Sequence, residues 1–577
     1  MPVRYYHRKK VRLLMWILII IAVLLFAWLC FLMIPQSGYY EQRANNLHER
    51  ERTIKAARGR IYDRNGVVLA DNQSVCTITV IHNQITDPER VIEVLSKELE
   101  LDADTVRKRV EKVSSIEKIK SNVPKAVGDV IRSYKLDGVN VDEDYARYYP
   151  YETLGSKVLG FTGGDNQGII GLEVKYDEYL AGTPGAILTT TDVRGLEVEN
   201  TAEKRIEPVN GQDLYTSIDY NIQAYCQQIA DKMLEQKEAK GVSIVLMNPQ
   251  NGEIYAMVNA PEFNLNEPYV FTAAVAEDEA YTGLSDNDKL NQMWRNTSIN
   301  DTYEPGSTFK IITSTAALEE KVVSLTDSFS CPGFRIVEDR RIRCHKTAGH
   351  GAETFLEGFM NSCNPVFIDV GARVGVDNMY KYFEKLGLFS KTGVDLPGES
   401  GSIMHKAANV GAVELATISF GQSFQITPLQ LLRAVSAVIN GGTLVTPHFG
   451  VKVSDSDASN VEVFQYDTSD SGLSEETCET MKMMLEKVVA EGTGNKAYIE
   501  GYRIGGKTAT SQKLPRGSGK YIASFLGFAP ANDPQVVGII LIDEPAGTYY
   551  GGTIAAPVMK EIYENVLPYL NVGSALQ

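Results

Sequence analysis

A serine and a lysine lie three residues apart at Ser307 and Lys310, directly after the turn-forming pair Pro305 and Gly306. Residues three apart on a helix face the same side, so the lysine amine can take the proton of the serine hydroxyl. A helix N-terminus carries partial positive charge, which favours an oxyanion there. Because an apolar run follows, we expect Lys310 to be desolvated, with a lowered pKa that suits a proton acceptor.

Two further motifs support acyl transfer. Ser362 and Asn364 form a Ser-x-Asn, and Lys507-Thr508-Ala509-Thr510 is a variant of Lys-Thr-Gly. With the Ser-x-x-Lys they stand in the order found in penicillin-binding proteins and class A β-lactamases. Two chance matches are set aside. Ser115–Lys118 lies in a charged stretch with no preceding glycine turn, and Lys391-Thr392-Gly393 runs into a loop signature.

The chain resembles the class B penicillin-binding proteins over nearly all of its length. The segments that carry this resemblance are Arg58-Gly59-Arg60-Ile61-Tyr62-Asp63-Arg64-Asn65-Gly66, Gly171-Leu172-Glu173, Ser419-Phe420-Gly421-Gln422, Thr427-Pro428-Leu429-Gln430, Phe528-Ala529-Pro530 and Tyr550-Gly551-Gly552. Among subtypes it is most similar to the division and sporulation members of Gram-positive bacteria. The resemblance implies an α+β fold with a mixed pedestal domain of the dimerisation type. A transpeptidase domain follows, with a five-stranded antiparallel sheet flanked by helices.

An uncharged apolar run from Leu13 to Ile34 is about 33 Å long as a helix, enough to cross a bilayer. The basic residues before it predict a cytoplasmic N-terminus and an extracytoplasmic catalytic domain, held in the cell membrane by one helix. We therefore divide the chain into a cytoplasmic tail (1–12), a transmembrane anchor (13–34), a pedestal (35–205) and a transpeptidase domain (206–577).

Local patterns predict several elements. Asp87 followed by Pro88 is typical of a helix start. The predicted elements are a helix through Val91, Val94 and Leu95, a helical stripe of Ile222, Cys226, Ile229 and Met233, a hairpin of 242–247 and 254–258, strands at 524–528 and 536–541, and a helix over 556–570.

The net charge of −16 argues against nucleic acid or anionic lipid as the main partner. The seven cysteines do not form a disulfide-rich pattern. Four residues, Cys331, Cys344, His350 and Cys363, instead form a Cys₃His set that is typical of structural Zn²⁺ sites, with His345 as a substitute ligand. The alternative left open is a Cys331–Cys344 disulfide with Cys363 a buried thiol.

The resemblance implies a D,D-transpeptidase that cross-links peptidoglycan and needs no cofactor for the chemistry. Ser307 would attack a stem peptide ending in D-Ala-D-Ala, with Lys310 as general base, and an amine of a neighbouring stem would accept the acyl group. Ser362 would relay a proton to the leaving amine, and Asn364 would hold the substrate backbone.

The third motif is implied to bind the end of the substrate. Lys507, Thr508 and Thr510 would hold the terminal carboxylate, and the N–H groups of Ser307 and Thr510 would form the oxyanion hole. β-Lactams would acylate the serine as mimics of D-Ala-D-Ala. Ala509 replaces the usual glycine, and we hypothesise that its methyl group crowds some β-lactams.

Other functions use the same motifs. A β-lactam-hydrolysing enzyme needs an activated water for deacylation, and a β-lactam-binding sensor needs a signalling region that twelve cytoplasmic residues do not supply. A catalytically dead scaffold is disfavoured because only the third-motif glycine is replaced. The sequence has no recognisable glycosyltransferase region, and the resemblance implies a separate SEDS-type glycosyltransferase as partner.

Overall fold

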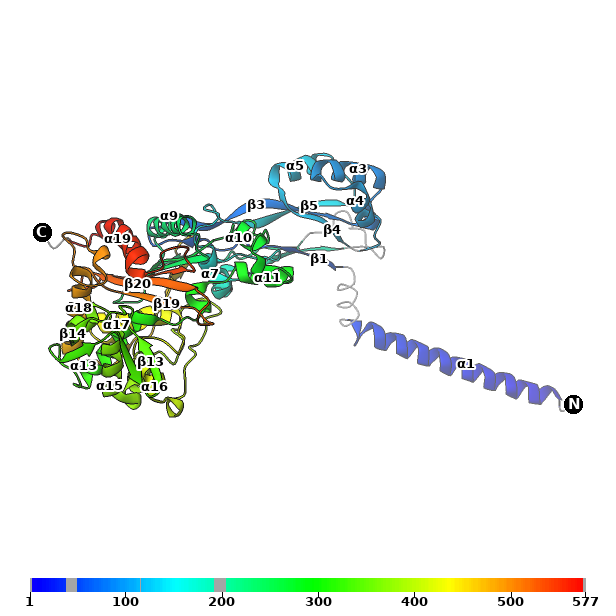
Figure 1. Ribbon diagram of the computed structural model, residues 1–577. Helices are drawn as coiled ribbons and strands as arrows, with labels where there is room; N and C mark the ends of the chain where they lie inside the picture. The colour runs from blue at the N-terminus through cyan, green and yellow to red at the C-terminus, as the bar shows by residue number, and fades with distance from the viewer. Residues whose placement is uncertain (1–2, 38–48, 115, 191–203, 574–577) are drawn as a thin grey trace. The chain divides into compact units, whose positions relative to one another are not determined.

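The computed structural model describes residues 3–37, 49–114, 116–190 and 204–573, which form two compact units (Figure 1). The described residues of the first unit lie within Met1–Ala57, Gln73–Ala146 and Gly182–Asn210, and those of the second lie within Arg58–Asn72, Arg147–Ala181 and Gly211–Gln577. The chain thus passes between the units several times. A single boundary after residue 205 stays a prediction.

The N-terminal helix α1 (Val3–Met33) contains all of the predicted apolar run except its last residue, Ile34. Its described side chains are almost all exposed, and from Leu13 onward none carries a charge. The helix is long and apolar enough to cross a membrane. It therefore fits the single-pass anchor predicted for residues 13–34.

The first unit combines a small sheet with three helices. β1 (Glu49–Ile54), β6 (Gly185–Thr190) and β7 (Lys204–Ile206) form an antiparallel sheet in the order β1-β6-β7. A second group comprises η1 (His82–Gln84), α3 (Pro88–Leu99), α4 (Ala103–Val110), β4 (Glu117–Pro124) and α5 (Lys125–Ser133). The predicted start of α3 is confirmed, because the Asp87 side chain accepts a hydrogen bond from the Arg90 N–H at 3.2 Å. Val91, Val94 and Leu95 are buried, as expected.

A buried ion network lies at the start of the second unit. The Glu173 carboxylate accepts hydrogen bonds of 2.6 Å from both Arg58 Nε and Arg147 Nε, and all three side chains are at most 2% exposed. Gly59 has no room for a side chain, since a Cβ would lie 1.8 Å from the carbonyl oxygen of Gln212. Two segments that carry the family resemblance, far apart in sequence, therefore form one structural unit.

Two long strands, β3 (Val68–Val80) and β5 (Val139–Tyr148), begin in one unit and end in the other, and β3 pairs with β4 in the first unit. The short elements of this part of the second unit are β2 (Ile61–Tyr62), α6 (Ser156–Leu159), α7 (Gly171–Lys175), α8 (Asp177–Leu180), β8 (Asp213–Thr216), β16 (Gly450–Ser454) and β17 (Val461–Val463). Within the second unit, β2 pairs parallel with β8, and β8 pairs antiparallel with β16.

The main sheet of the second unit has five strands in the order β10-β9-β21-β20-β19, and all neighbours are antiparallel. The strands are β9 (Gly241–Met247), β10 (Ile254–Ala260), β19 (Gly505–Gln512), β20 (Tyr521–Ala529) and β21 (Val536–Asp543). The predicted sheet, the hairpin of β9 and β10, and the two later strands are confirmed. β19 is an edge strand, which leaves one side of its backbone free to face a cleft.

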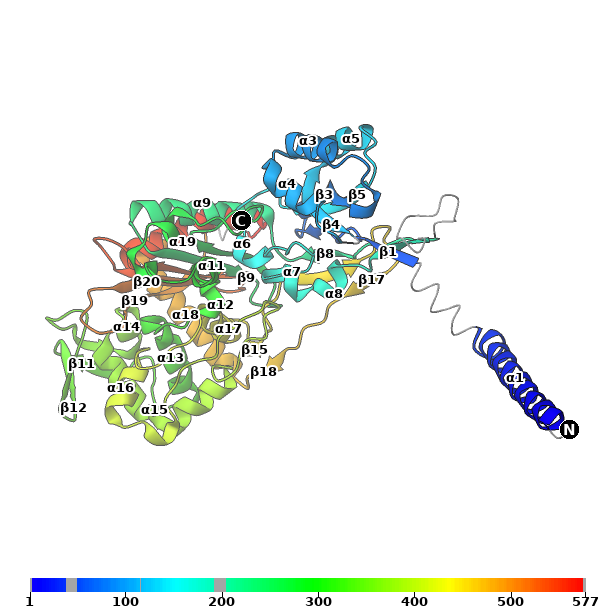
Figure 2. The same cartoon turned by 90° about the vertical axis from the view of Figure 1, so that its right-hand side faces the viewer.

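Helices cover both faces of this sheet (Figures 1 and 2). On one face α9 (Tyr220–Gln236) and α19 (Gly551–Tyr569) share a core with Ile244 and Leu246 of β9. The predicted stripe of α9 is buried in this core, as expected. On the other face Val245 and Met247 join the core of α13 (Lys310–Glu319) and α17 (Pro428–Ile439). Residues alternate between the two cores along β9 and β21, so these central strands are buried on both faces.

The remaining elements of the second unit connect this framework. They are α10 (Ala273–Ala276), η2 (Glu279–Tyr281), α11 (Asp286–Met293), α12 (Thr297–Asn300), η3 (Gly306–Phe309), β11 (Ser328–Cys331), β12 (Phe334–Val337), β13 (Arg340–Arg343), β14 (Gly351–Thr354), α14 (Phe355–Met360), α15 (Asn364–Lys385), η4 (Ala407–Asn409), α16 (Ala412–Ile418), β15 (Thr443–Leu444), β18 (Ser469–Asp470), α18 (Glu475–Ala490) and η5 (Asn495–Ala497).

Candidate active site

Ser307 lies in the single 3₁₀ turn η3, and α13 begins at Lys310. From Tyr303 to Ala317 every residue except Ser307 is buried. Gly306 before it has a φ of +58°, and a Cβ there would lie 2.5 Å from the Ser511 hydroxyl. Only glycine therefore fits this position of the turn. Because its neighbours are buried, Ser307 is the one residue of this segment whose side chain reaches solvent.

The amine of Lys310 is fully buried and forms hydrogen bonds with Ser362 and Asn364 of the Ser-x-Asn motif. Its Nζ donates to the Ser362 carbonyl oxygen at 2.7 Å, to Ser362 Oγ at 3.2 Å and to Asn364 Oδ1 at 2.8 Å. Burial lowers the pKa of Lys310 to about 8, partly offset by the thiol groups of Cys363 and Cys344. The structure thus brings the first two motifs together around one amine that is readily deprotonated.

Ser362 is held in an unusual backbone conformation between α14 and α15. Its φ is +55°, in the left-handed region that side chains rarely adopt. Asn364 begins α15, where Pro365 occupies the first turn. Such a strained residue persists only where its surroundings fix it, and here it presents both its carbonyl and its hydroxyl oxygen to Lys310.

The third motif lies on the edge strand β19. Lys507 is fully buried, and burial together with the nearby charge of Lys310 lowers the pKa of Lys507 well below its ordinary value. Thr510 Oγ1 accepts a hydrogen bond from the Gly551 N–H at 3.0 Å, and Thr508 Oγ1 donates to Thr493 Oγ1 at 3.2 Å. By contrast, residues 391–393 lie in a loop, where Glu399 accepts hydrogen bonds from the backbone, as the loop signature predicted.

The methyl group of Ala509 is buried, with 3% of the residue exposed. A Cβ built on Gly306 would lie 3.6 Å from it, so the methyl group packs against the turn that carries Ser307. The hypothesis that Ala509 affects β-lactams stays open. The geometry favours an effect through the position of the turn over direct contact with the drug.

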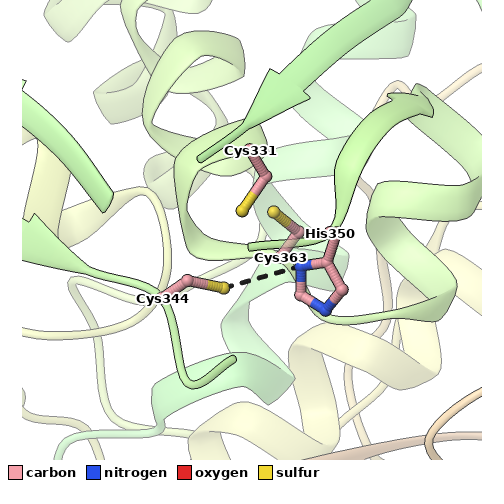
Figure 3. Close-up of side chains that lie close together, drawn as sticks. All are labelled: Cys331, Cys344, His350 and Cys363. Atoms are coloured by element: carbon pink, nitrogen blue, oxygen red, sulfur yellow. Dashed lines mark hydrogen bonds between the residues drawn. The ribbon is translucent and has the colours of Figure 1, made fainter. Parts of the chain in front are cut away.

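Four residues gather beside the second motif. β12 and β13 form a hairpin, and β11 pairs with β14 on either side of it in the chain; these strand pairs bring Cys331, Cys344 and His350 to Cys363 (Figure 3). Their ligand atoms all lie within 4.8 Å of one another. Ligands about 2.3 Å from a tetrahedral ion would be about 3.8 Å apart, so these residues could hold a metal ion. All cysteines are free thiols, so the alternative disulfide is not formed.

Electrostatics at this cluster favour a cation. The hydrogen bond between the thiols lowers the pKa of Cys344 and raises that of Cys363. Glu353 is buried, and among the residues that the structure describes its Oε2 has no hydrogen-bond partner; this oxygen lies 3.8 Å from His350 Nδ1. His345 also approaches Cys344, with Nδ1 at 3.8 Å from the sulfur. The sequence interpretation missed Glu353, although it lies three residues after His350.

The sequence interpretation also missed an ion pair, between Glu304 and Arg516, that stabilises the turn carrying Ser307. The Glu304 carboxylate accepts a hydrogen bond from Ser423 N–H at 2.9 Å and forms an ion pair with Arg516 in the loop between β19 and β20. The Gly306 N–H donates to the Gly421 carbonyl oxygen at 2.9 Å. These contacts connect segments more than a hundred residues apart, which no local pattern reveals.

The comparisons with known proteins agree with this arrangement. Residues 242–564 match the family profile of the penicillin-binding protein transpeptidase domain, and residues 53–216 match the penicillin-binding protein dimerisation domain. The chain is 40% identical to Stage V sporulation protein D of Bacillus subtilis (strain 168), over 95% of this chain and 85% of that protein.

The chain belongs to the class B penicillin-binding proteins. Of the division and sporulation members that the sequence resemblance indicated together, it is of the sporulation type. This penicillin-binding protein also shares 30% identity with the peptidoglycan D,D-transpeptidase FtsI of Escherichia coli (strain K12), over 91% of this chain and 85% of that one.

Solved structures have the same fold. Penicillin Binding Protein 2X of Streptococcus thermophilus superposes with a TM-score of 0.72 at 21% identity, over 90% of this chain and 80% of that one. Penicillin binding protein 3 of Mycobacterium tuberculosis, complexed with aztreonam, gives 0.67 at 25% identity, over 91% and 98% of the two chains.

Proposed function

We propose that this penicillin-binding protein is a serine D,D-transpeptidase that cross-links peptidoglycan stem peptides and is acylated by β-lactams. One observation carries the proposal. The Lys310 amine is buried, has a lowered pKa and is bound to the Ser-x-Asn motif, one helical turn from the half-buried Ser307. A neutral amine in that position is a general base for the serine.

The first half-reaction forms an acyl-enzyme. Neutral Lys310 takes the proton of Ser307 Oγ, which attacks the carbonyl carbon between the two D-Ala residues. The N–H groups of Ser307 and Thr510 stabilise the oxyanion. The C–N bond then breaks, and the proton passes from Lys310 through Ser362 Oγ to the leaving amine of D-Ala, which departs neutral.

The second half-reaction runs in the reverse direction. An amine of a neighbouring stem attacks the ester carbonyl and loses its proton through Ser362 to Lys310. Collapse of the oxyanion returns that proton to Ser307 Oγ and leaves a new peptide bond. Asn364 orients the donor backbone throughout, and Lys507 with Thr508 holds its terminal carboxylate before cleavage.

The competing functions predict different products. A hydrolase would release the opened β-lactam quickly, and a sensor would keep the adduct without turning over any peptide. The family match to the transpeptidase domain favours transfer.

Intact mass of the full-length protein in detergent tests the nucleophile. We expect one stable adduct after benzylpenicillin, and none in Ser307→Ala, because Ser307 is the residue of the segment 303–317 that is not fully buried and lies one turn before the buried Lys310 amine. Ser298→Ala, a buried serine outside the cleft, should still form the adduct. An adduct that persists in Ser307→Ala would contradict the assignment.

The acylation rate should rise with pH through about 8 and then level off. Below that pH, Lys310 is protonated and cannot accept the serine proton. Above it, the neutral amine predominates. The measurement is the second-order rate constant for benzylpenicillin from pH 6 to pH 10. Lys310→Arg stays charged throughout and should be slower by about 10²–10⁴-fold without the rise. A flat wild-type profile would show that Lys310 is not the base.

The membrane arrangement and the partners are further parts of this proposal. The basic residues before α1 favour a cytoplasmic N-terminus with the catalytic unit outside. Because no glycosyltransferase region is recognisable, a SEDS-type glycosyltransferase would supply the glycan strands. Similarity to Stage V sporulation protein D favours a role in sporulation over division.

We also propose that the Cys₃His cluster binds a structural Zn²⁺. Three sulfur ligands and an imidazole suit this ion, and the buried Glu353 carboxylate beside His350 adds negative charge that favours a cation there. Bound zinc would fix the loop that carries Ser362 and Asn364 and would take no part in acyl transfer. His350 would be the imidazole ligand, with His345 as its substitute.

Metal analysis tests this site. The protein purified without chelator should contain about one equivalent of zinc, and Cys331→Ser should contain less than about a tenth. Cys478→Ser is the matched control, because this buried thiol lies outside the cluster and its loss should leave the zinc content unchanged. A wild-type content below about a tenth of an equivalent would refute the site.

A further inference from the structure

Two exposed arginines lie on the small hairpin beside the second motif. β12 and β13 form a two-stranded sheet, and Arg341 and Arg343 of β13 are exposed. Neither forms an ion pair with any residue that the structure describes, whereas Arg335 of the same hairpin pairs with Asp369. Two unpaired cations on a chain with a net charge of −16 are available to an anionic ligand.

The hairpin has one face against the second unit and one face in solvent. Side chains alternate along each strand, and directly opposite residues share a face. Arg335 and Ile342 lie opposite each other, and both face the unit, since Ile342 packs against its core and Arg335 pairs with Asp369. Arg341 and Arg343 therefore share the solvent face.

The solvent face is arranged to bind a carboxylate. Phe334 lies opposite Arg343, and the guanidinium carbon of Arg341 is 3.8 Å from the centre of the Phe334 ring. A guanidinium stacked on a ring is held in place, and the N–H groups on its edge remain free for two parallel hydrogen bonds to a carboxylate. The acidic residues of this hairpin, Glu338 and Asp339, are in its turn, at the opposite end from Arg343.

The base of the hairpin adjoins the catalytic centre. Asn364 Nδ2 donates to the Arg343 carbonyl oxygen at 3.3 Å, and Asn364 Oδ1 accepts from Lys310 at 2.8 Å. In the proposed mechanism the donor lies along β19, and the acceptor amine arrives at Ser362, to which it passes its proton. The acceptor stem then lies on the Ser-x-Asn side of the cleft, which is the side of this hairpin.

We propose that Arg341 and Arg343 bind the terminal carboxylate of the acceptor stem peptide. The inference rests on the proposed function, because the acceptor side is taken from the path of the proton through Ser362. A neighbouring stem ends in a carboxylate, as the donor stem does, and carries the attacking amine on the same short peptide. Binding the carboxylate at the hairpin holds that amine near the ester on Ser307.

The test compares two acceptors with one donor. The full-length protein in detergent receives the thioester N-benzoyl-D-alanyl-thioglycolate, which acylates the serine, together with a synthetic tetrapeptide stem. This stem has a free side-chain amine and a single C-terminal D-Ala, and it is supplied as the C-terminal acid and as the C-terminal amide. We expect the KM of the acid to be at least about fivefold lower, because only the acid offers a terminal carboxylate to the guanidinium groups.

Variants of the hairpin assign this preference to the two arginines. Arg341→Gln/Arg343→Gln should reduce the ratio of the two KM values to below about twofold, and Arg341→Lys/Arg343→Lys should keep most of it because the charge remains. Arg340→Gln is the matched control. Arg340 is on the same strand but one residue out of phase with the pair, and it lies 3.6 Å from Asp339, so its loss should leave the ratio unchanged.

The outcomes separate acceptor binding from the chemistry. Equal KM values for acid and amide in the wild type would overturn the inference while transfer continues. A preference that survives in Arg341→Gln/Arg343→Gln, or that falls equally in Arg340→Gln, would also overturn it. If the double glutamine variant forms no benzylpenicillin adduct, the single change Arg343→Gln replaces it with the same expectation. A wild type that transfers to neither acceptor would instead refute the proposed function.

Discussion

The hydrogen bonds of one buried amine organise the catalytic centre. Lys310 Nζ reaches three oxygen atoms of Ser362 and Asn364 and has no carboxylate partner among the described residues. Neutral oxygen acceptors satisfy the amine without fixing its charge, so burial lowers its pKa to about 8. A buried acid in their place would raise that pKa. The chemistry therefore depends on burial that excludes water from the amine and on hydrogen bonds from it to neutral oxygen atoms, an effect that the nearby Cys363, Cys344 and Glu353 offset only in part.

That partner loop is itself strained. Ser362 adopts a φ of +55° so that its carbonyl and hydroxyl both face Lys310. Neighbouring Cys363 is part of the Cys₃His cluster, whose other members lie at the ends of the paired strands β11–β14 and of the hairpin β12–β13. The loop is thus held in position from outside the cleft, where its own sequence would favour another conformation. Contacts with distant segments also hold the turn that carries Ser307. Gly306 allows its positive φ, and Glu304 binds Ser423 and Arg516.

Much of this arrangement could be predicted from the sequence. The spacing of apolar residues predicted α3, α9 and strands of the main sheet, because each of these segments has a clear local pattern of apolar and polar residues. The three motifs could be placed because their residue types are rare in combination. Contacts that join distant segments could not be predicted, such as Arg516 with Glu304 or Glu353 beside His350. They arise from packing of the whole unit. The burial of Ala509 could not be predicted either, because its methyl group packs against the distant turn that carries Ser307.

A crystal structure of the benzylpenicillin adduct tests the central claim most directly. The account predicts an ester on Ser307 Oγ, with its carbonyl oxygen between the N–H groups of Ser307 and Thr510. Lys310 Nζ should remain bonded to Ser362 and Asn364 and lie within hydrogen-bond reach of the ester oxygen. An adduct whose carbonyl oxygen points away from Thr510, or a Lys310 that has turned to pair with a carboxylate, would contradict it.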